Sequence, residues 1–176
     1  ELPARGDALI FLHGDVPDLA GRAERVTSDV ARQLGRLVRE VIDASGDTKG
    51  DRERVARFVL ECVFAMFAED TDLTPPNLFT NAVRRADEAH ALDPVWTLFD
   101  DFARDDASER LNRFAPYVDG PLFDRHHPKL SLTEGQIHDL HTAASDFDWQ
   151  DVRPEIFGSI FEQALDPDER HELGAH

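Results

Sequence analysis

The hydrophobic positions of this chain repeat at helical spacing over most of its length. The clearest example runs from about Arg52 to Asp70, where apolar residues recur at steps of three and four. Such steps place side chains on one face of a helix, and this stripe is wide enough to predict the central helix of a bundle. Its members are Val55, Phe58, Val59, Cys62, Val63, Met66 and Phe67.

A helix before this one is predicted from Val26 onward, with apolar residues continuing to Val41. The polar residues 27–29 offer N-cap chemistry, and Gly46 marks the far end. Residues 45–51 then form a polar loop. After the central helix, Pro75-Pro76 prevents helix continuation, and a shorter helix is expected from Asn77 to His90.

The pattern after residue 90 predicts further short helices. Asp93-Pro94 opens one, with an acidic N-cap and a proline in the first turn. Ser108 is expected to cap a short helix that contains Leu111 and Phe114. Residues 116–132 are predicted to form an ordered aromatic loop.

The last third of the chain adds two helices. Thr133 and Gln136 match a capping box, and the following helix turns Ile137, Leu140 and Ala144 inward. Pro154 begins another helix, with inward residues Ile156, Phe157, Ile160, Phe161 and Leu165.

One short stretch does not follow helical periodicity. Ala8 to Leu12 form an apolar run that predicts a strand or a docked extended segment. The expected fold is therefore all-α or nearly so, a multi-helix orthogonal bundle with a short N-terminal extended segment. The 176 residues suit one domain, and 41% of them are hydrophobic, which favours a globular chain over a disordered one.

Composition narrows the classes of protein. No apolar run approaches the roughly 18 residues of a membrane span, and no basic-flanked signal segment precedes residue 8. Cys62 is the single cysteine, which excludes an internal disulfide and fits a reducing cytoplasm. The formal net charge of −17 repels phosphates, so DNA contacts would have to come mainly from other segments.

The acidic pairs are too frequent to mark a site by themselves. Glu69-Asp70, Asp100-Asp101 and Asp105-Asp106 are expected to be solvated surface, the usual state in so acidic a chain. A nuclease would need two acids and a lysine converging on a metal. The one acid-x-Lys match, residues 47–49, lies in a loop, so no catalytic residue is predicted.

Histidines raise the possibility of a metal. His138 and His141 share one predicted helix at i, i+3, and His126-His127 precede it. A zinc site needs three or four ligands in suitable positions. The sequence shows no complete set of ligands, so we expect no metal. No Gly-rich phosphate loop and no defensible Ser-His-Asp order occurs either.

Three stretches together resemble a known family: RFVLECVFAMFAEDT (residues 57–71), YVDGPLF (117–123) and DWQDVRPEIFGSIFEQALDPDERHELGAH (148–176). Their order and spacing are similar to the helical spacer of MmeI-like type IIG restriction–modification enzymes, which are large DNA adenine methyltransferases. GDALIFLHG, from Gly6, resembles the start of that region.

The resemblance implies a position for the end of the chain. In that family the GAH stretch continues into motif X, which helps to form the S-adenosylmethionine pocket. Gly174, Ala175 and His176 are therefore expected to be its first half, as partial cofactor-binding residues, although a glycine there also suits a helix C-cap.

The resemblance also implies what the chain does. Family members flip an adenine out of the duplex and position it with an Asn/Asp-Pro-Pro-aromatic motif. Neither that motif nor the Gly-rich cofactor loop occurs here, so the chain would be a spacer in a cytoplasmic bacterial or archaeal enzyme. Its partners would be double-stranded DNA through the rest of the parent chain and the domains on either side.

The implied division is a leading segment over residues 1–21, a helical spacer over 22–146 and a connector helix over 147–176. Four arginines could touch a phosphate, although balancing nearby acids is the simpler interpretation: Arg84, Arg85, Arg110 and Arg113. The alternative hypothesis is a stand-alone acidic interaction module, either a DNA mimic or a regulatory protein.

Overall fold

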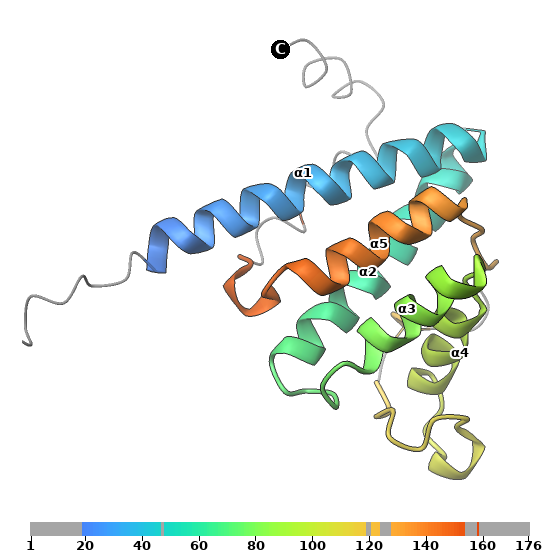
Figure 1. Ribbon diagram of the computed structural model, residues 1–176. Coiled ribbons are helices and arrows are strands. Elements are labelled where there is room, and N and C mark those ends of the chain that lie inside the picture. The colour runs from blue at the N-terminus through green and yellow to red at the C-terminus, as the bar shows by residue number, and fades with distance from the viewer. Residues whose placement is uncertain (1–18, 47, 119–120, 124–127, 154–157, 159–176) are drawn as a thin grey trace, which may run out of the picture.

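The computed structural model describes residues 19–46, 48–118, 121–123, 128–153 and 158, and the structural findings concern these residues. Within them the chain forms five α-helices and two 3-10 turns, without a strand, which confirms the all-α prediction (Figure 1). The expected strand at 8–12 lies outside the described residues, as does the expected helix from Pro154 except for residue 158, which is helical. In chain order the elements are α1 (Leu19–Ser45), α2 (Lys49–Asp70), α3 (Leu78–Ala89), α4 (Asp93–Phe102), η2 (Ala107–Glu109), α5 (Glu134–Asp146) and η3 (Trp149–Asp151).

The long helix α1 and the much later helix α5 lie side by side (Figure 1). Helix α1 also packs against α2, and α3 packs against both α4 and α5. The last turn, η3, returns to contact α1 and α2. Five helices therefore share one core, and segments far apart in sequence meet in it. No helix among the described residues is long and apolar enough to cross a membrane.

Helix α2 contributes most of the core, as its apolar stripe predicts. Six of the seven stripe residues are buried, and the exception, Phe67, is partly buried. Phe58 contacts two rings of α4, with centroids 5.2 Å from Trp96 and 6.3 Å from Phe99. Phe99 in turn lies 5.2 Å from Phe123, so the predicted aromatic loop inserts a ring into this core.

Helix α1 begins earlier than its apolar pattern indicates, and the prediction of an N-cap at 27–29 is wrong. Those residues lie inside a helix that starts at Leu19. Tertiary contacts support the additional turns, since Arg22 Nε lies 2.7 Å from Asp151 Oδ2. The Thr27 hydroxyl accepts from the Arg153 N–H instead of capping α1. The predicted far end is confirmed, because α1 stops at Ser45 and Gly46 has φ +103°.

Helix α2 also begins earlier than predicted, at Lys49. Thr48 and Asp51 form a reciprocal capping box: the Asp51 N–H donates to Thr48 Oγ1, and the Thr48 N–H donates to Asp51 Oδ2. The polar loop between the first two helices is correspondingly shorter. Helix α4 does begin at Asp93, but Leu92 occupies the cap position and makes no side-chain cap bond.

The short helix predicted after Ser108 does not form. A single 3-10 turn, capped by Asp106, replaces it, and Leu111 and Phe114 are 79% and 68% exposed. The reason is that the backbone N–H groups of residues 111 and 112 donate to a buried carboxylate on α4 rather than to a helical partner. Tertiary hydrogen bonding therefore overrides the local pattern here.

The capping box at the start of α5 is confirmed. The Thr133 N–H donates to Gln136 Oε1 over 2.9 Å, and the Gln136 N–H donates to Thr133 Oγ1 over 3.4 Å. Ile137 and Leu140 are buried as predicted, whereas Ala144 is only partly covered. The ring of Trp149 follows α5 and is fully buried, so the core extends into η3.

Candidate functional site

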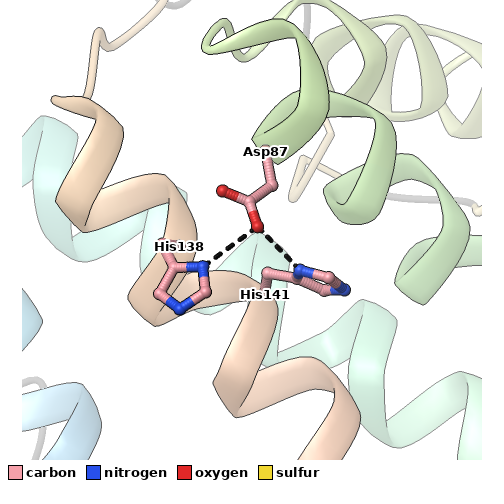
Figure 2. A group of neighbouring side chains, drawn as sticks. All are labelled: Asp87, His138 and His141. Atoms are coloured by element: carbon pink, nitrogen blue, oxygen red, sulfur yellow. Dashed lines mark hydrogen bonds and ion pairs between the residues drawn. The ribbon is translucent and has the colours of Figure 1, made fainter.

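Three side chains from two helices converge on one point between α3 and α5. His138 and His141 lie one turn apart on α5, and both rings turn toward the carboxylate of Asp87, which α3 presents from the opposite side (Figure 2). The Nδ1 atoms of His138 and His141 lie 3.1 Å and 2.9 Å from the same oxygen, Asp87 Oδ2. The three candidate ligand atoms all lie within 4.8 Å of one another.

Helix geometry explains this convergence. Residues three apart on a helix face the same way, so the i, i+3 spacing puts both imidazoles toward α3. The side chain of His138 is 68% exposed, whereas His141 and Asp87 are 25% and 22% exposed. The hydrogen bonds from His141 and His138 lower the pKa of Asp87.

Asp87 carries no signal in the sequence that marks it as a ligand. It lies 51 and 54 residues before the two histidines, and only the packing of α3 on α5 brings the three together. The expectation of no metal depended on the lack of a third ligand. The structure supplies that ligand, and imidazole nitrogens with a carboxylate oxygen form a donor set that can hold a divalent transition metal.

Glu69 and Asp70 were expected to be solvated, and for Glu69 this prediction is wrong. Glu69 is buried and accepts hydrogen bonds from the first turn of α3. Asp70 Oδ2 accepts from the Trp149 N–H over 2.7 Å, which fixes η3 against α2. Partial burial raises the pKa of Asp70 despite this hydrogen bond. Both acids therefore join segments of the chain to one another.

The second acidic pair divides in the same way. Asp101 is fully buried and accepts from the N–H groups of Leu111 and Asn112 over 2.9 Å and 2.7 Å. Arg104 Nη1 adds a donor at 3.2 Å. Its neighbour Asp100 forms a more exposed ion pair with Lys129, 3.2 Å apart. The prediction of a solvated surface is therefore wrong for Asp101.

The other acidic and basic residues considered in the sequence interact with near neighbours along the chain or lie outside the described residues. Asp105 and Asp106 are exposed, and Asp106 accepts from the Ser108 N–H to cap η2. In the rejected acid-x-Lys match, Thr48 caps α2 and the Lys49 amine lies 3.8 Å from Glu53. Gly174, Ala175 and His176, the predicted S-adenosylmethionine residues, lie outside the described residues, as do His126 and His127.

A hollow of about 300 Å³ lies beside the aromatic cluster. Phe58, Trp96 and Phe99 line it, and the buried carboxylate of Glu61 borders it. Desolvation raises the pKa of Glu61 to about 7, opposed by the charge of Arg57. Arg57 Nε lies 3.5 Å from Glu61 Oε1, at ion-pair distance, but makes no hydrogen bond. Glu61 is thus a buried acid that carries its charge at a cost.

The four arginines proposed for phosphate contact have mostly internal partners. Arg84 pairs with Glu88 at 2.5 Å, and Arg85 Nε donates to the Asn81 carbonyl. Arg110 donates to three backbone carbonyls of its own loop, at residues 104, 105 and 115. Arg113 lies over the Phe114 ring, 5.7 Å from its centroid. These contacts favour the interpretation that the arginines serve the fold.

The central part of the chain matches a known protein family. Residues 53–123, from α2 through the aromatic loop, match the family model described as the MmeI helicase spacer domain. This part of the chain is an MmeI-type helicase spacer domain. The matched region contains the apolar stripe of α2. It also contains Glu69, Asp70 and Asp101, whose carboxylates accept hydrogen bonds from other segments of the chain.

The spacer domain is also similar to part of a much longer protein. The whole chain is 30% identical over 125 residues to DNA methyltransferase A of Bacillus subtilis (strain 168), a stretch longer than the spacer match alone. That match covers 68% of this chain and 14% of the relative, so the chain corresponds to a small part of the relative's length. No solved structure gives a significant match.

Proposed function

We propose that this spacer domain belongs to an S-adenosylmethionine-dependent DNA N6-adenine methyltransferase of a bacterial or archaeal restriction–modification or other phage-defence system. There it fixes the separation and orientation of the methyltransferase relative to an upstream domain. The similarity to DNA methyltransferase A and the spacer family match support this assignment. Residues 1–176 contain no Asn/Asp-Pro-Pro-aromatic motif, so the chemistry would take place elsewhere in the parent.

The observation that best supports a mechanical role is that buried or partly buried carboxylates hydrogen-bond from one segment of the chain to another and so tether the segments. Glu69 joins α2 to α3, Asp70 joins α2 to η3, and Asp101 joins α4 to the loop after it. Charge-assisted hydrogen bonds of this kind are directional, so they fix angles between elements as well as distances. A spacer that sets the position of two other domains needs this rigidity.

The connector over residues 147–176 would lead from the spacer into the methyltransferase. In this proposal Gly174, Ala175 and His176 begin motif X and contact the cofactor only when the rest of the pocket is present. The isolated chain should therefore show no S-adenosylmethionine binding by calorimetry, whereas the parent protein should bind it. Clear binding by the isolated chain would contradict the proposal of an incomplete pocket.

The positioning role can be tested in the parent protein with the double variant Glu69→Ala/Asp70→Ala. Loosened tethers should leave the affinity for S-adenosylmethionine unchanged and reduce methyl transfer to DNA, because only the domain geometry changes. Asp72→Asn removes the charge of an exposed acid two residues away and serves as the control, because asparagine tolerates the left-handed backbone at this position (φ +59°). Full methylation by a folded double variant would show that the spacer does not position the catalytic domain.

The net charge of −17 favours a second candidate, an acidic interaction module that mimics DNA. A mimic should present its acids as an exposed row, whereas Glu69, Asp70 and Asp101 point inward to backbone N–H groups. Sequencing the parent gene beyond His176 separates the two. Tyr-Thr followed by a Gly-rich loop supports the methyltransferase, and a stop codon supports the interaction module.

A further inference from the structure

We propose that Asp87, His138 and His141 bind one divalent transition-metal ion of the zinc class, which cross-links α3 to α5 (Figure 2). Two imidazole nitrogens and one carboxylate oxygen form a mixed donor set that zinc and its first-row neighbours accept readily. Magnesium and calcium prefer sites made of oxygen atoms alone. The donor types therefore select the class of ion.

The ligand atoms lie at hydrogen-bond distance and would have to separate by a few tenths of an ångström to admit such an ion. Zinc binds imidazole nitrogen and carboxylate oxygen at about 2.0–2.2 Å, so adjacent ligands of a tetrahedral site lie roughly 3.3–3.5 Å apart. The two histidine Nδ1 atoms lie 3.1 Å and 2.9 Å from Asp87 Oδ2. Side-chain adjustment alone would admit the ion, and His138, at 68% exposure, has room to turn.

The backbone that carries the ligands is already fixed. The capping box of Thr133 and Gln136 defines the first turn of α5, from which both histidines follow at i, i+3 spacing. Helix α3 packs closely against α5 and holds Asp87 opposite them. Because the ligands are pre-positioned by two packed helices, little ordering entropy opposes binding.

The site would have three protein ligands, and its exposed side would leave a position for water. Its consequence for the spacer is mechanical, since the ion joins two helices whose ligands are more than 50 residues apart in sequence. An ion that binds the folded state and not the unfolded chain stabilises the fold, by an amount that grows with the logarithm of its free concentration above Kd. Zinc would then make the α3–α5 contact more rigid.

The test is a calorimetric titration of the untagged 176-residue chain with zinc chloride at pH 7.5. We expect one tight site in the wild-type chain, and a rise in melting temperature of about 5–10 °C at a hundredfold excess over Kd. His138→Ala and His141→Ala should each weaken this site at least about tenfold. Cobalt(II) should give visible ligand-field absorption that both substitutions abolish.

The matched control is His90→Ala. His90 also faces a carboxylate across the same pair of helices, with its Nδ1 4.0 Å from Glu134 Oε2, but it is not one of the three ligands. This variant should bind zinc like the wild type. The exposed His138→Ala variant should keep its zinc-free melting temperature, so weaker binding cannot be attributed to unfolding. Unchanged affinity in both ligand variants, or no uptake by the wild type at 1 mM zinc, would overturn the proposal.

Discussion

The Glu69 carboxylate at the end of α2 accepts a hydrogen bond from the Thr80 hydroxyl at the start of α3, with Oε1 and Oγ1 2.6 Å apart. Its other oxygen accepts the backbone N–H groups of Phe79 and Thr80 at 2.5 Å and 3.1 Å. Asn77, at the N-cap of α3, has φ +57° and makes no side-chain cap bond. An acid from the preceding helix therefore supplies the cap that α3 lacks.

Glu69→Ala should destabilise the chain by about 2–4 kcal/mol, because three donors would lose their acceptor in a buried setting. Urea unfolding followed by circular dichroism measures this change. Glu88→Ala removes an exposed ion-pair partner of Arg84 on α3, and it should change the free energy of unfolding little. Equal midpoints for the two variants would mean that Glu69 does not cap α3.

Phe58→Ala should cost about 3–5 kcal/mol of unfolding free energy, because the ring is buried among Trp96 and Phe99. Phe67→Ala, on the same helix, should cost less because its ring is only partly buried. Thermal and urea unfolding of both variants provides the comparison. If Phe67→Ala lowered the free energy of unfolding more than Phe58→Ala, the buried face assigned to α2 would be wrong.

Glu61 should make stability depend on pH. Its pKa is raised in the folded state from 4.5 to about 7, chiefly by desolvation, so folding favours the protonated acid. Its contribution is most favourable below about pH 4.5 and is lost as pH rises toward 7. A pKa difference of about 2.5 corresponds to about 3 kcal/mol.

Glu61→Gln removes this titration. The variant should therefore be more stable than the wild type at pH 8, by up to about 3 kcal/mol, and nearly equal to it at pH 4.5. Urea unfolding of both proteins at the two pH values isolates the contribution, since all other groups are shared. A wild-type-minus-variant difference that does not vary with pH would show that Glu61 titrates normally.

The sequence predicts helices well where the apolar period and a local cap agree. The stripe of α2 and the Thr133–Gln136 capping box need only neighbouring residues, and both are found in the structure. The early start of α1 has no such local signal, and the contact at its first turn, between Arg22 and Asp151, comes from a segment far along the chain. The helix expected after Ser108 is absent for a similar reason. The backbone N–H groups of Leu111 and Asn112 donate to the carboxylate of Asp101 on α4.

The candidate site shows the same division. The i, i+3 spacing of His138 and His141 is visible in the sequence, and helix geometry places both rings on one side. Asp87 carries no comparable signal, since it is one of 36 acidic residues and lies in another helix. Only the packing of α3 on α5 distinguishes it from the others.

The sequence by itself determined the helical class of the fold, the buried face of α2 and the resemblance to an MmeI-like spacer. These follow from local periodicity, cap chemistry and short motifs, which act over a few residues. The tertiary structure alone decided which acids are buried as tethers and which one faces the histidines. Burial and ligand geometry depend on segments that meet only after folding, because an acid has the same local pattern whether it faces water or a distant backbone N–H.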